Sequence, residues 1–165
     1  MVPTWDDYFM TMVYFVATKS KDERTHMGAV VIGPNRETVS TGYNSFVRGA
    51  NDDVPERQQR GEKQFWFEHA ETNALHNARL SLEGCVLYTN CVPCINCARA
   101  IVQKGIKEVV VDLKWPTNTA EWAERNKRTL ELFAEVGVKL RYHDTQYVSI
   151  AGFNLREGMQ VGLSC

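Results

Sequence analysis

The chain has 165 residues, of which 44% are hydrophobic and 24% are charged, so it can form one well-buried core but not two comfortable domains. Its formal net charge of -1 argues against a nucleic-acid partner or an anionic membrane and favours a small molecule. We therefore expect one domain over residues 1–165, with 144–165 as a C-terminal tail that has no assigned element.

The first half of the chain predicts a helix, a hairpin and a long loop. Thr4 to Asp7 has the Thr-x-x-Asp form that caps a helix, and apolar residues then recur at helical spacing to about Thr18. Strands over 28–32 and 38–41 flank a turn at 33–35 and predict an antiparallel hairpin. Residues 44–64 are polar and read as a long loop, which is usually functional in a compact domain.

The second half predicts alternating helices and strands. Helices are expected over about 68–79, 94–104 and 122–135, and strands over 86–89, 108–111 and 138–142. Gly105 and Gly137 lie where a left-handed cap ends a helix. This order predicts an α/β fold in which helices cover both faces of a central mixed five-stranded sheet, giving three layers.

Two short motifs carry the chemistry: His69-Ala70-Glu71 and Pro93-Cys94-Ile95-Asn96-Cys97. Imidazole and thiolate groups are preferred zinc ligands, and three protein ligands leave the fourth position for a water that the metal acidifies. Both motifs fall at expected helix starts, where the positive helix ends favour the thiolate forms of Cys94 and Cys97. The pattern predicts a catalytic zinc site; the alternative is a buried histidine, a surface Glu71 and incidental cysteines.

The cysteine pattern favours metal binding over disulfides. The five cysteines are an odd number, and three of them are bunched at intervals of three, which suits a reducing compartment. Cys91, Cys94 and Cys97 could also begin an iron–sulfur cluster or a cysteine-rich zinc knuckle, but no second cysteine cluster completes either. Cys85 and Cys165 are expected to be structural or incidental.

The sequence predicts a cytoplasmic protein. No stretch is long and apolar enough to span a bilayer, and the start of the chain lacks the basic and then apolar order of a secretion signal. We therefore expect no membrane partner.

The two motifs and several flanking segments resemble the zinc-dependent cytidine deaminase superfamily, and most closely the deoxycytidylate (dCMP) deaminase family. The resemblance covers about residues 4 to 112 and continues more weakly to about 142, whereas the tail matches nothing. Besides the two motifs, the segments that carry the resemblance are 5–10, 19–22, Gly28-Ala29-Val30, Gly42-Tyr43-Asn44, Asn51-Asp52-Asp53, Asn73-Ala74 and 98–106.

The resemblance implies a cytidine deaminase-like three-layer α-β-α fold and hydrolysis of dCMP to dUMP and ammonia. His69, Cys94 and Cys97 would hold Zn²⁺, while Glu71 would carry a proton from water to ring N3 and then to the departing amine. A homo-oligomer is expected on the same ground.

Substrate contacts are also implied by the resemblance. Asn44 would hydrogen-bond the sugar or base edge, and the backbone of Ala70 would help to read the base. Asn44 is alternatively a turn residue that tolerates positive φ. The basic and hydroxyl side chains that suit the phosphate are Lys19, Ser20, Lys21, Arg57, Arg60 and Lys63. The alternative for the charged ones is that they lie on loops and only contact water.

Some features depart from the family pattern or leave alternatives open. Ser45 and Val47 replace the Gly and Pro that follow Gly-Tyr-Asn in regulated members, which puts nucleotide feedback control in doubt. The aromatic run over 65–67 suits the core, a subunit interface or base stacking. One competing function is deamination of another nucleoside, nucleotide or base, such as dCTP, 5-substituted dCMP, cytidine or a purine. Two others are nucleic-acid editing and a non-catalytic zinc module. The intact Glu71 argues against the non-catalytic module.

Overall fold

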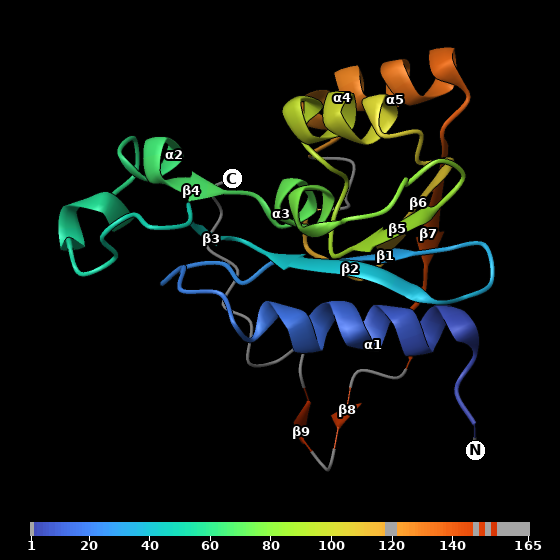
Figure 1. Ribbon diagram of the computed structural model, residues 1–165, viewed down its shortest axis with the longest axis horizontal. Coiled ribbons are helices and arrows are strands. Elements are labelled where there is room, and N and C mark those ends of the chain that lie inside the picture. Colours follow the sequence, from blue (N-terminus) through green and yellow to red (C-terminus); the bar gives the residue numbers. More distant parts are fainter. Residues whose placement is uncertain (1, 118–121, 147–148, 151–152, 155–165) are drawn as a thin grey trace.

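A five-stranded mixed sheet forms the centre of the computed structural model, which describes residues 2–117, 122–146, 149–150 and 153–154 (Figure 1). The strand order is β2-β1-β5-β6-β7, with β1 antiparallel to both neighbours and β5, β6 and β7 parallel. The predicted mixed five-stranded sheet is therefore confirmed. Its strands are β1 (Gly28–Ile32), β2 (Thr38–Tyr43), β5 (Val86–Thr89), β6 (Glu108–Asp112) and β7 (Lys139–His143).

Helices cover both faces of this sheet, as the alternation of elements predicts. Helix α1 lies on one face, and α3, α4 and α5 lie on the other (Figure 1). Within the described ranges, no helix has the length and apolar character needed to cross a membrane. The helices are α1 (Trp5–Ala17), α3 (Ala70–Asn77), α4 (Ile95–Gln103) and α5 (Ala123–Val136).

The core lies on both sides of the three inner strands. All five residues of β1 are buried, and Val109, Val110 and Val111 of β6 are inaccessible to solvent. Strands covered on both faces read as continuous apolar runs rather than alternating ones, which explains the sequence of β6. On one side, Phe9, Met10 and other apolar residues of α1 complete the core.

The segment predicted as a long loop contains short elements that the sequence analysis missed. Strand β3 (Ser45–Phe46) pairs antiparallel with β4 (Phe67–Glu68), and between them lie a 3₁₀ helix η1 (Pro55–Gln58) and helix α2 (Lys63–Trp66). Together they project from the main body (Figure 1). Glu68, expected to begin a helix, belongs to a strand instead, because the backbone stays extended through His69.

The C-terminal tail, to which the sequence assigns no element, contains two short strands. Strand β8 (Ser149–Ile150) pairs with β9 (Phe153–Asn154) in a separate two-stranded sheet. The other predicted helices and strands are confirmed to within two residues, except β1 and β5, which match in full.

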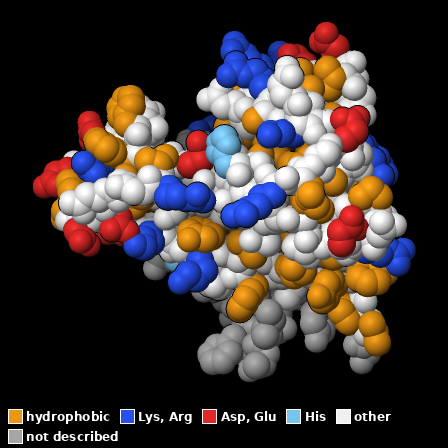
Figure 2. All heavy atoms as spheres, viewed as in Figure 1, with side chains coloured by type: hydrophobic (Ala, Val, Ile, Leu, Met, Phe, Trp, Pro, Cys, Tyr) orange, Lys and Arg blue, Asp and Glu red, His pale blue; other side chains and the backbone are white. Residues whose placement is uncertain are grey.

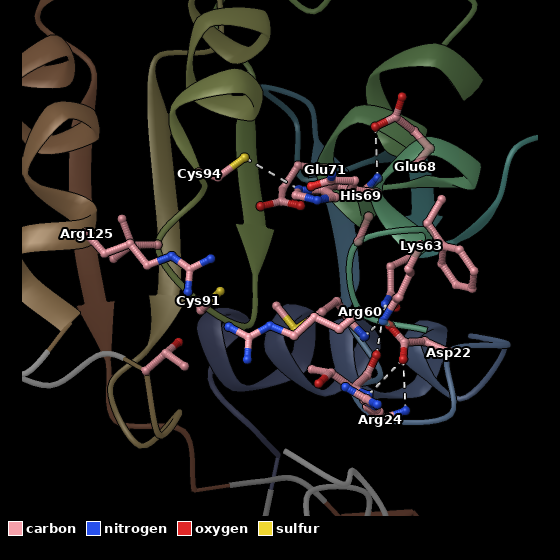
Figure 3. Close-up of a pocket in the computed structure, with 18 of the residues that line it drawn as sticks. Asp22, Arg24, Arg60, Lys63, Glu68, His69, Glu71, Cys91, Cys94 and Arg125 are labelled. Atoms are coloured by element: carbon pink, nitrogen blue, oxygen red, sulfur yellow. Dashed lines mark hydrogen bonds and ion pairs between the residues drawn. The ribbon is translucent and has the colours of Figure 1, made fainter. Parts of the chain in front are cut away.

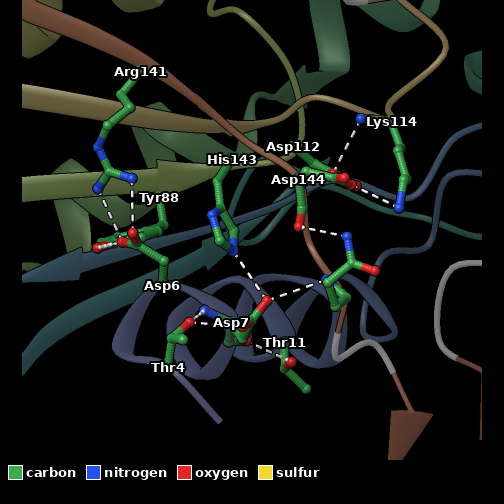
Figure 4. Close-up of polar contacts among 11 residues, drawn as sticks. Thr4, Asp6, Asp7, Thr11, Tyr88, Asp112, Lys114, Arg141, His143 and Asp144 are labelled. Carbon is green, nitrogen blue, oxygen red and sulfur yellow. Dashed lines mark hydrogen bonds and ion pairs between the residues drawn. The ribbon is translucent and has the colours of Figure 1, made fainter.

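Charged side chains fasten α1 to the edge of the sheet (Figure 4). The guanidinium of Arg141 on β7 donates to both carboxylate oxygens of Asp6, at 2.7 and 2.9 Å, and its Nε donates to Glu108 at 2.8 Å. Although burial alone would raise it, the pKa of Asp6 is lowered by hydrogen bonds from Arg141 and Tyr88. One residue along, Asp7 contacts Nε2 of His143 at 3.0 Å, so an ion pair and a histidine–carboxylate contact anchor the start of α1.

Helix α3 packs directly against β2 at Gly42. A Cβ atom built on Gly42 would lie 2.2 Å from the backbone nitrogen of Ala74 and 2.3 Å from the carbonyl oxygen of Ala70. Both atoms belong to the helix backbone, which cannot move aside as a flexible side chain can. The absence of a side chain at Gly42 therefore sets how closely α3 approaches the sheet.

We expect Gly42→Ala to lower the free energy of unfolding by about 3 kcal/mol, because the added methyl group overpacks a backbone-to-backbone contact. Chemical denaturation measures this change. Gly33→Ala is the matched control, since its Cβ would meet only the flexible side chain of Glu37. Equal stability of the two variants would contradict the packing argument.

Candidate metal centre and active site

The two motifs span the starts of two helices, α3 and α4, whose first turns face each other. His69 is the N-cap residue of α3, with φ -74° and ψ 154°, and Cys94 is the N-cap residue of α4, with φ -65° and ψ 163°. Both helices begin one or two residues later than predicted. Cys97 follows in the first turn of α4, so two segments distant in sequence supply three ligand atoms to one point.

The distances between these atoms fit zinc. Nδ1 of His69 lies 3.5 Å from Sγ of Cys94 and 3.4 Å from Sγ of Cys97. Zinc bonds of about 2.3 Å to sulfur and about 2.05 Å to nitrogen, in tetrahedral geometry, place the two ligand atoms about 3.6 Å apart. Among the described residues, His69, Cys94 and Cys97 form the group that could hold a metal ion. Cys91 lies outside this group, as the sequence analysis concluded.

The three ligand side chains share protons: the hydrogen bond to Cys94 raises the pKa of the Cys97 thiol, whereas Cys94 is the thiolate. Hydrogen bonds with Cys97 and then His69 lower the pKa of the Cys94 thiol to about 3. The hydrogen bond to Cys94 in turn raises the pKa of His69 to about 9. The site thus stabilises a thiolate beside a positive charge, and a metal cation can replace the protons that the group shares.

Hydroxyl groups hold the ligand segments in place. The Thr72 hydroxyl, in the first turn of α3, lies 3.3 Å from Sγ of Cys97. Thr129 of α5 donates a hydrogen bond of 2.9 Å to the carbonyl oxygen of Pro93, directly before Cys94. Groups of this kind orient metal ligands and tune their affinity.

Glu71 lies beside the three ligands without joining them. Its side chain is buried, with 4% of its surface exposed, and burial raises the pKa of the carboxyl group. Glu68 has a different role, because its carboxylate accepts a hydrogen bond of 2.9 Å from the backbone nitrogen of His69. A carboxyl group that is near the metal position but not a ligand can carry protons.

His69, Cys94 and Glu71 open onto one cavity of about 580 Å³ (Figure 3). One wall comes from residues 22–27 and Asn44, and another comes from residues 58–64 before and within α2. The third wall contains Trp122, Arg125 and Asn126 at the start of α5. The cavity has the size of a small-molecule site, and its mostly apolar lining with a few polar groups is typical of one.

Three of the predicted substrate contacts besides Glu71 and the ligands line this cavity: Ala70, Arg60 and Lys63. Asn44 lines it as well, but both polar atoms of its amide have protein partners. Its Oδ1 accepts from the Met27 backbone at 2.8 Å, and its Nδ2 donates to Asp22 and to the Thr25 carbonyl. Asn44 therefore shapes the wall, and its contact with a substrate stays a prediction.

Four of the predicted phosphate contacts, Lys19, Ser20, Lys21 and Arg57, are not among the cavity-lining residues. The Ser20 hydroxyl donates to the Asn44 carbonyl at 2.8 Å, and Lys21 pairs with Asp52. Arg57 stacks 3.5 Å above the ring of Trp66 and donates to the Asn51 carbonyl. Lys19 follows the end of α1, where its backbone donates to Val16. We therefore do not assign these four side chains to the phosphate.

Arg24 and Arg125 line the cavity but were missed by the sequence analysis. Arg125 occupies an ordinary exposed position of a predicted helix, about thirty residues beyond the metal motif. Nothing in its local sequence distinguishes it from Arg128 on the same helix. Only the packing of α5 beside α4 brings it to the cavity.

Comparison with known proteins agrees with this arrangement. Residues 3–113 match the cytidine and deoxycytidylate deaminase zinc-binding region. The chain belongs to this family. The family's zinc-binding character agrees with the His69, Cys94 and Cys97 group, so the prediction of zinc as the cofactor is confirmed.

Relatives match most of the chain. A deaminase of uncharacterised role from the luxG 3' region of Aliivibrio fischeri is 34% identical over 144 residues, or 86% of this chain and 95% of the relative. Deoxycytidylate deaminase of Mus musculus is 30% identical over 152 residues, or 88% of this chain and 83% of the mouse protein. A probable deoxycytidylate deaminase of Drosophila melanogaster is 39% identical over 117 residues, and the chain spans only 58% of its length.

A solved structure confirms the deaminase fold. The dCMP deaminase of cyanophage S-TIM5, in complex with dCMP and dUMP, superposes with a TM-score of 0.66 at 20% identity. The match covers 87% of this chain and 99% of the phage chain. The predicted cytidine deaminase-like fold is thereby confirmed.

We expect Thr72→Val to weaken zinc binding by about 10- to 100-fold, because it removes the hydroxyl beside Cys97 while keeping the shape of the side chain. Competition with a chromophoric chelator measures the dissociation constant. Thr72→Ser keeps the hydroxyl and is expected to bind zinc almost as the wild type does. Identical affinities for the valine and serine variants would show that this hydroxyl does not support the ligand.

Proposed function

We propose that this protein catalyses the zinc-dependent hydrolytic deamination of a cytosine deoxynucleotide, converting dCMP and water to dUMP and ammonia. The observation that carries the proposal is the buried Glu71, which faces the same cavity as a three-ligand zinc group. Relatives named deoxycytidylate deaminase support the choice of substrate. A structural zinc site has no use for a carboxylate at this position.

The three ligands fit a catalytic zinc ion better than a structural one. His69, Cys94 and Cys97 supply one nitrogen and two sulfur atoms, and among the described residues no fourth ligand joins them. Bound zinc supplies a Lewis acid that lowers the pKa of a water in the open position. Because the cavity begins at this position, a substrate can enter beside it.

Glu71 is proposed to move the protons of the reaction. It accepts a proton from the attacking water and delivers it to ring N3 as oxygen adds to C4. It then transfers the proton of the new hydroxyl group to the amine, which leaves as ammonia. Its position in the first turn of α3, two residues after His69, places the carboxyl group beside the metal position without using it as a ligand.

Residues in the wall of the cavity are proposed to contact the base and so to recognise it. The backbone of Ala70 lies between His69 and Glu71, so it borders the place where the ring must sit. Asn44 is proposed to contact the sugar or base edge, and doing so would replace one of its three present hydrogen bonds. Assembly as a homo-oligomer and a cytoplasmic location stay predictions.

One experiment tests the substrate class. Zinc per chain is measured in the purified protein, and ammonia release is followed with dCMP, dCTP, deoxycytidine, cytidine and 5-methyl-dCMP. We expect stoichiometric zinc and the highest kcat/KM with dCMP. Zinc without turnover of any cytosine compound would disprove the proposed function and favour a non-catalytic zinc module.

Two substitutions test zinc binding and proton transfer separately. We expect Glu71→Gln to keep zinc and to lower kcat at least about 10²-fold, because the amide cannot shuttle protons. Cys94→Ala is expected to lose both zinc and turnover, because it removes a ligand. Metal analysis and steady-state kinetics on the same preparations check both results. Wild-type turnover by the Glu71→Gln variant would mean that another group carries the proton.

A further inference from the structure

Four of the described residues that line the cavity are basic, and one of them is already neutralised. Lys63 forms an ion pair with the buried carboxylate of Asp22. Asp22 also accepts hydrogen bonds from Asn44 and from the backbone of Arg24 and Thr25. The Lys63 charge is therefore used to hold two walls of the cavity together. The full basic set is Arg24, Arg60, Lys63 and Arg125.

Arg60 and Arg125 have no such acidic partner. Across the described parts of the chain, neither guanidinium lies within ion-pair distance of a carboxylate. Arg125 instead rests on the indole ring of Trp122, with 4.9 Å between its guanidinium carbon and the ring centre. That contact leaves the planar hydrogen-bond donors of Arg125 available.

The two arginines face the cavity from different walls. Arg60 comes from the turn between η1 and α2, and Arg125 comes from the first turn of α5 (Figure 3). In the same view both extend into the space beside the metal ligands and Glu71, whereas Arg24 lies beyond Asp22. Basic side chains also gather on the surface between the projecting segment that carries α2 and the main body (Figure 2).

The acidic groups of the cavity do not cancel this charge. Asp22 is paired with Lys63, and Glu68 accepts only from the neutral backbone N–H of His69, so the lining has four basic side chains against three carboxyl groups. Glu71 lies at the buried end, next to the metal position. Among the described residues no carboxylate pairs with Arg60 or Arg125, so the outer part of the cavity carries a positive charge that suits an anionic ligand.

We propose that Arg60 and Arg125 form a clamp for the 5'-phosphate of the substrate and that this clamp makes the enzyme select nucleotides over nucleosides. The inference rests on the proposed deaminase function and specifies its substrate class. With the cytosine ring beside Glu71, the phosphate points to the outer cavity, where the two guanidinium groups approach it from opposite sides. Each offers a planar donor pair that matches phosphate oxygens.

The test compares Arg60→Gln and Arg125→Gln with Arg128→Gln, which removes an exposed arginine of the same helix outside the cavity. The readout is the ratio of kcat/KM for dCMP to that for deoxycytidine. We expect each clamp substitution to lower this ratio at least about tenfold, as loss of a charged hydrogen bond does, and Arg128→Gln to leave it unchanged. Thermal denaturation verifies that all variants are folded.

A binding measurement keeps this test separate from catalysis. Calorimetry with dUMP and deoxyuridine is expected to show that the wild type prefers dUMP and that both clamp variants lose most of that preference. Unchanged dCMP to deoxycytidine ratios, or an unchanged preference for dUMP, would overturn the clamp. If the wild type turned over no cytosine compound, the deaminase function would fail, whereas a preference for dUMP that depends on the two arginines would still support the clamp.

Discussion

The site depends on the meeting of two helix starts. His69 precedes α3 and Cys94 precedes α4, and a metal can bind only if both first turns stay within a few ångströms of each other. Helix α3 is fixed by its backbone contact with Gly42 on β2, and the segment before α4 is fixed by Thr129 of α5. The sheet and α5 therefore determine the geometry of the ligands, and zinc binding follows from tertiary packing as much as from the two motifs.

Sequence reasoning succeeded where the signal is local. A few neighbouring residues suffice to recognise the apolar runs of β1 and β6 and the helical spacing of α1. The same holds for the ligand chemistry of His69, Cys94 and Cys97. It failed for β3 and β4, because a two-residue strand has no periodicity to detect, and its backbone pairing forms only when Phe46 and Phe67 meet. It also missed Arg125, because the approach of α5 to the cavity is not encoded near that residue.

The same side chain serves different purposes in different surroundings. Arg141 forms ion pairs with Asp6 and Glu108, which raise its pKa. Its hydrogen-bond donors therefore join α1 to the sheet. Lys63 likewise forms an ion pair with Asp22. Arg60 and Arg125 are of the same chemical class but have no carboxylate within ion-pair distance among the described residues. The partners of a basic residue, rather than its type, distinguish a structural cation from one that can bind a ligand.

Different parts of the fold form the two ends of the cavity. The chemical end of the cavity is formed by helices packed on the sheet, where Gly42, Thr72 and Thr129 leave little room for change. The outer end is formed by an exposed turn at Arg60 and by the exposed first turn of α5. Substitutions there alter charge without disturbing a buried contact, because surface changes of this kind usually cost little stability. The hydrolytic centre and the choice of nucleotide are thus held by separate parts of the fold, and the second can change while the first is preserved.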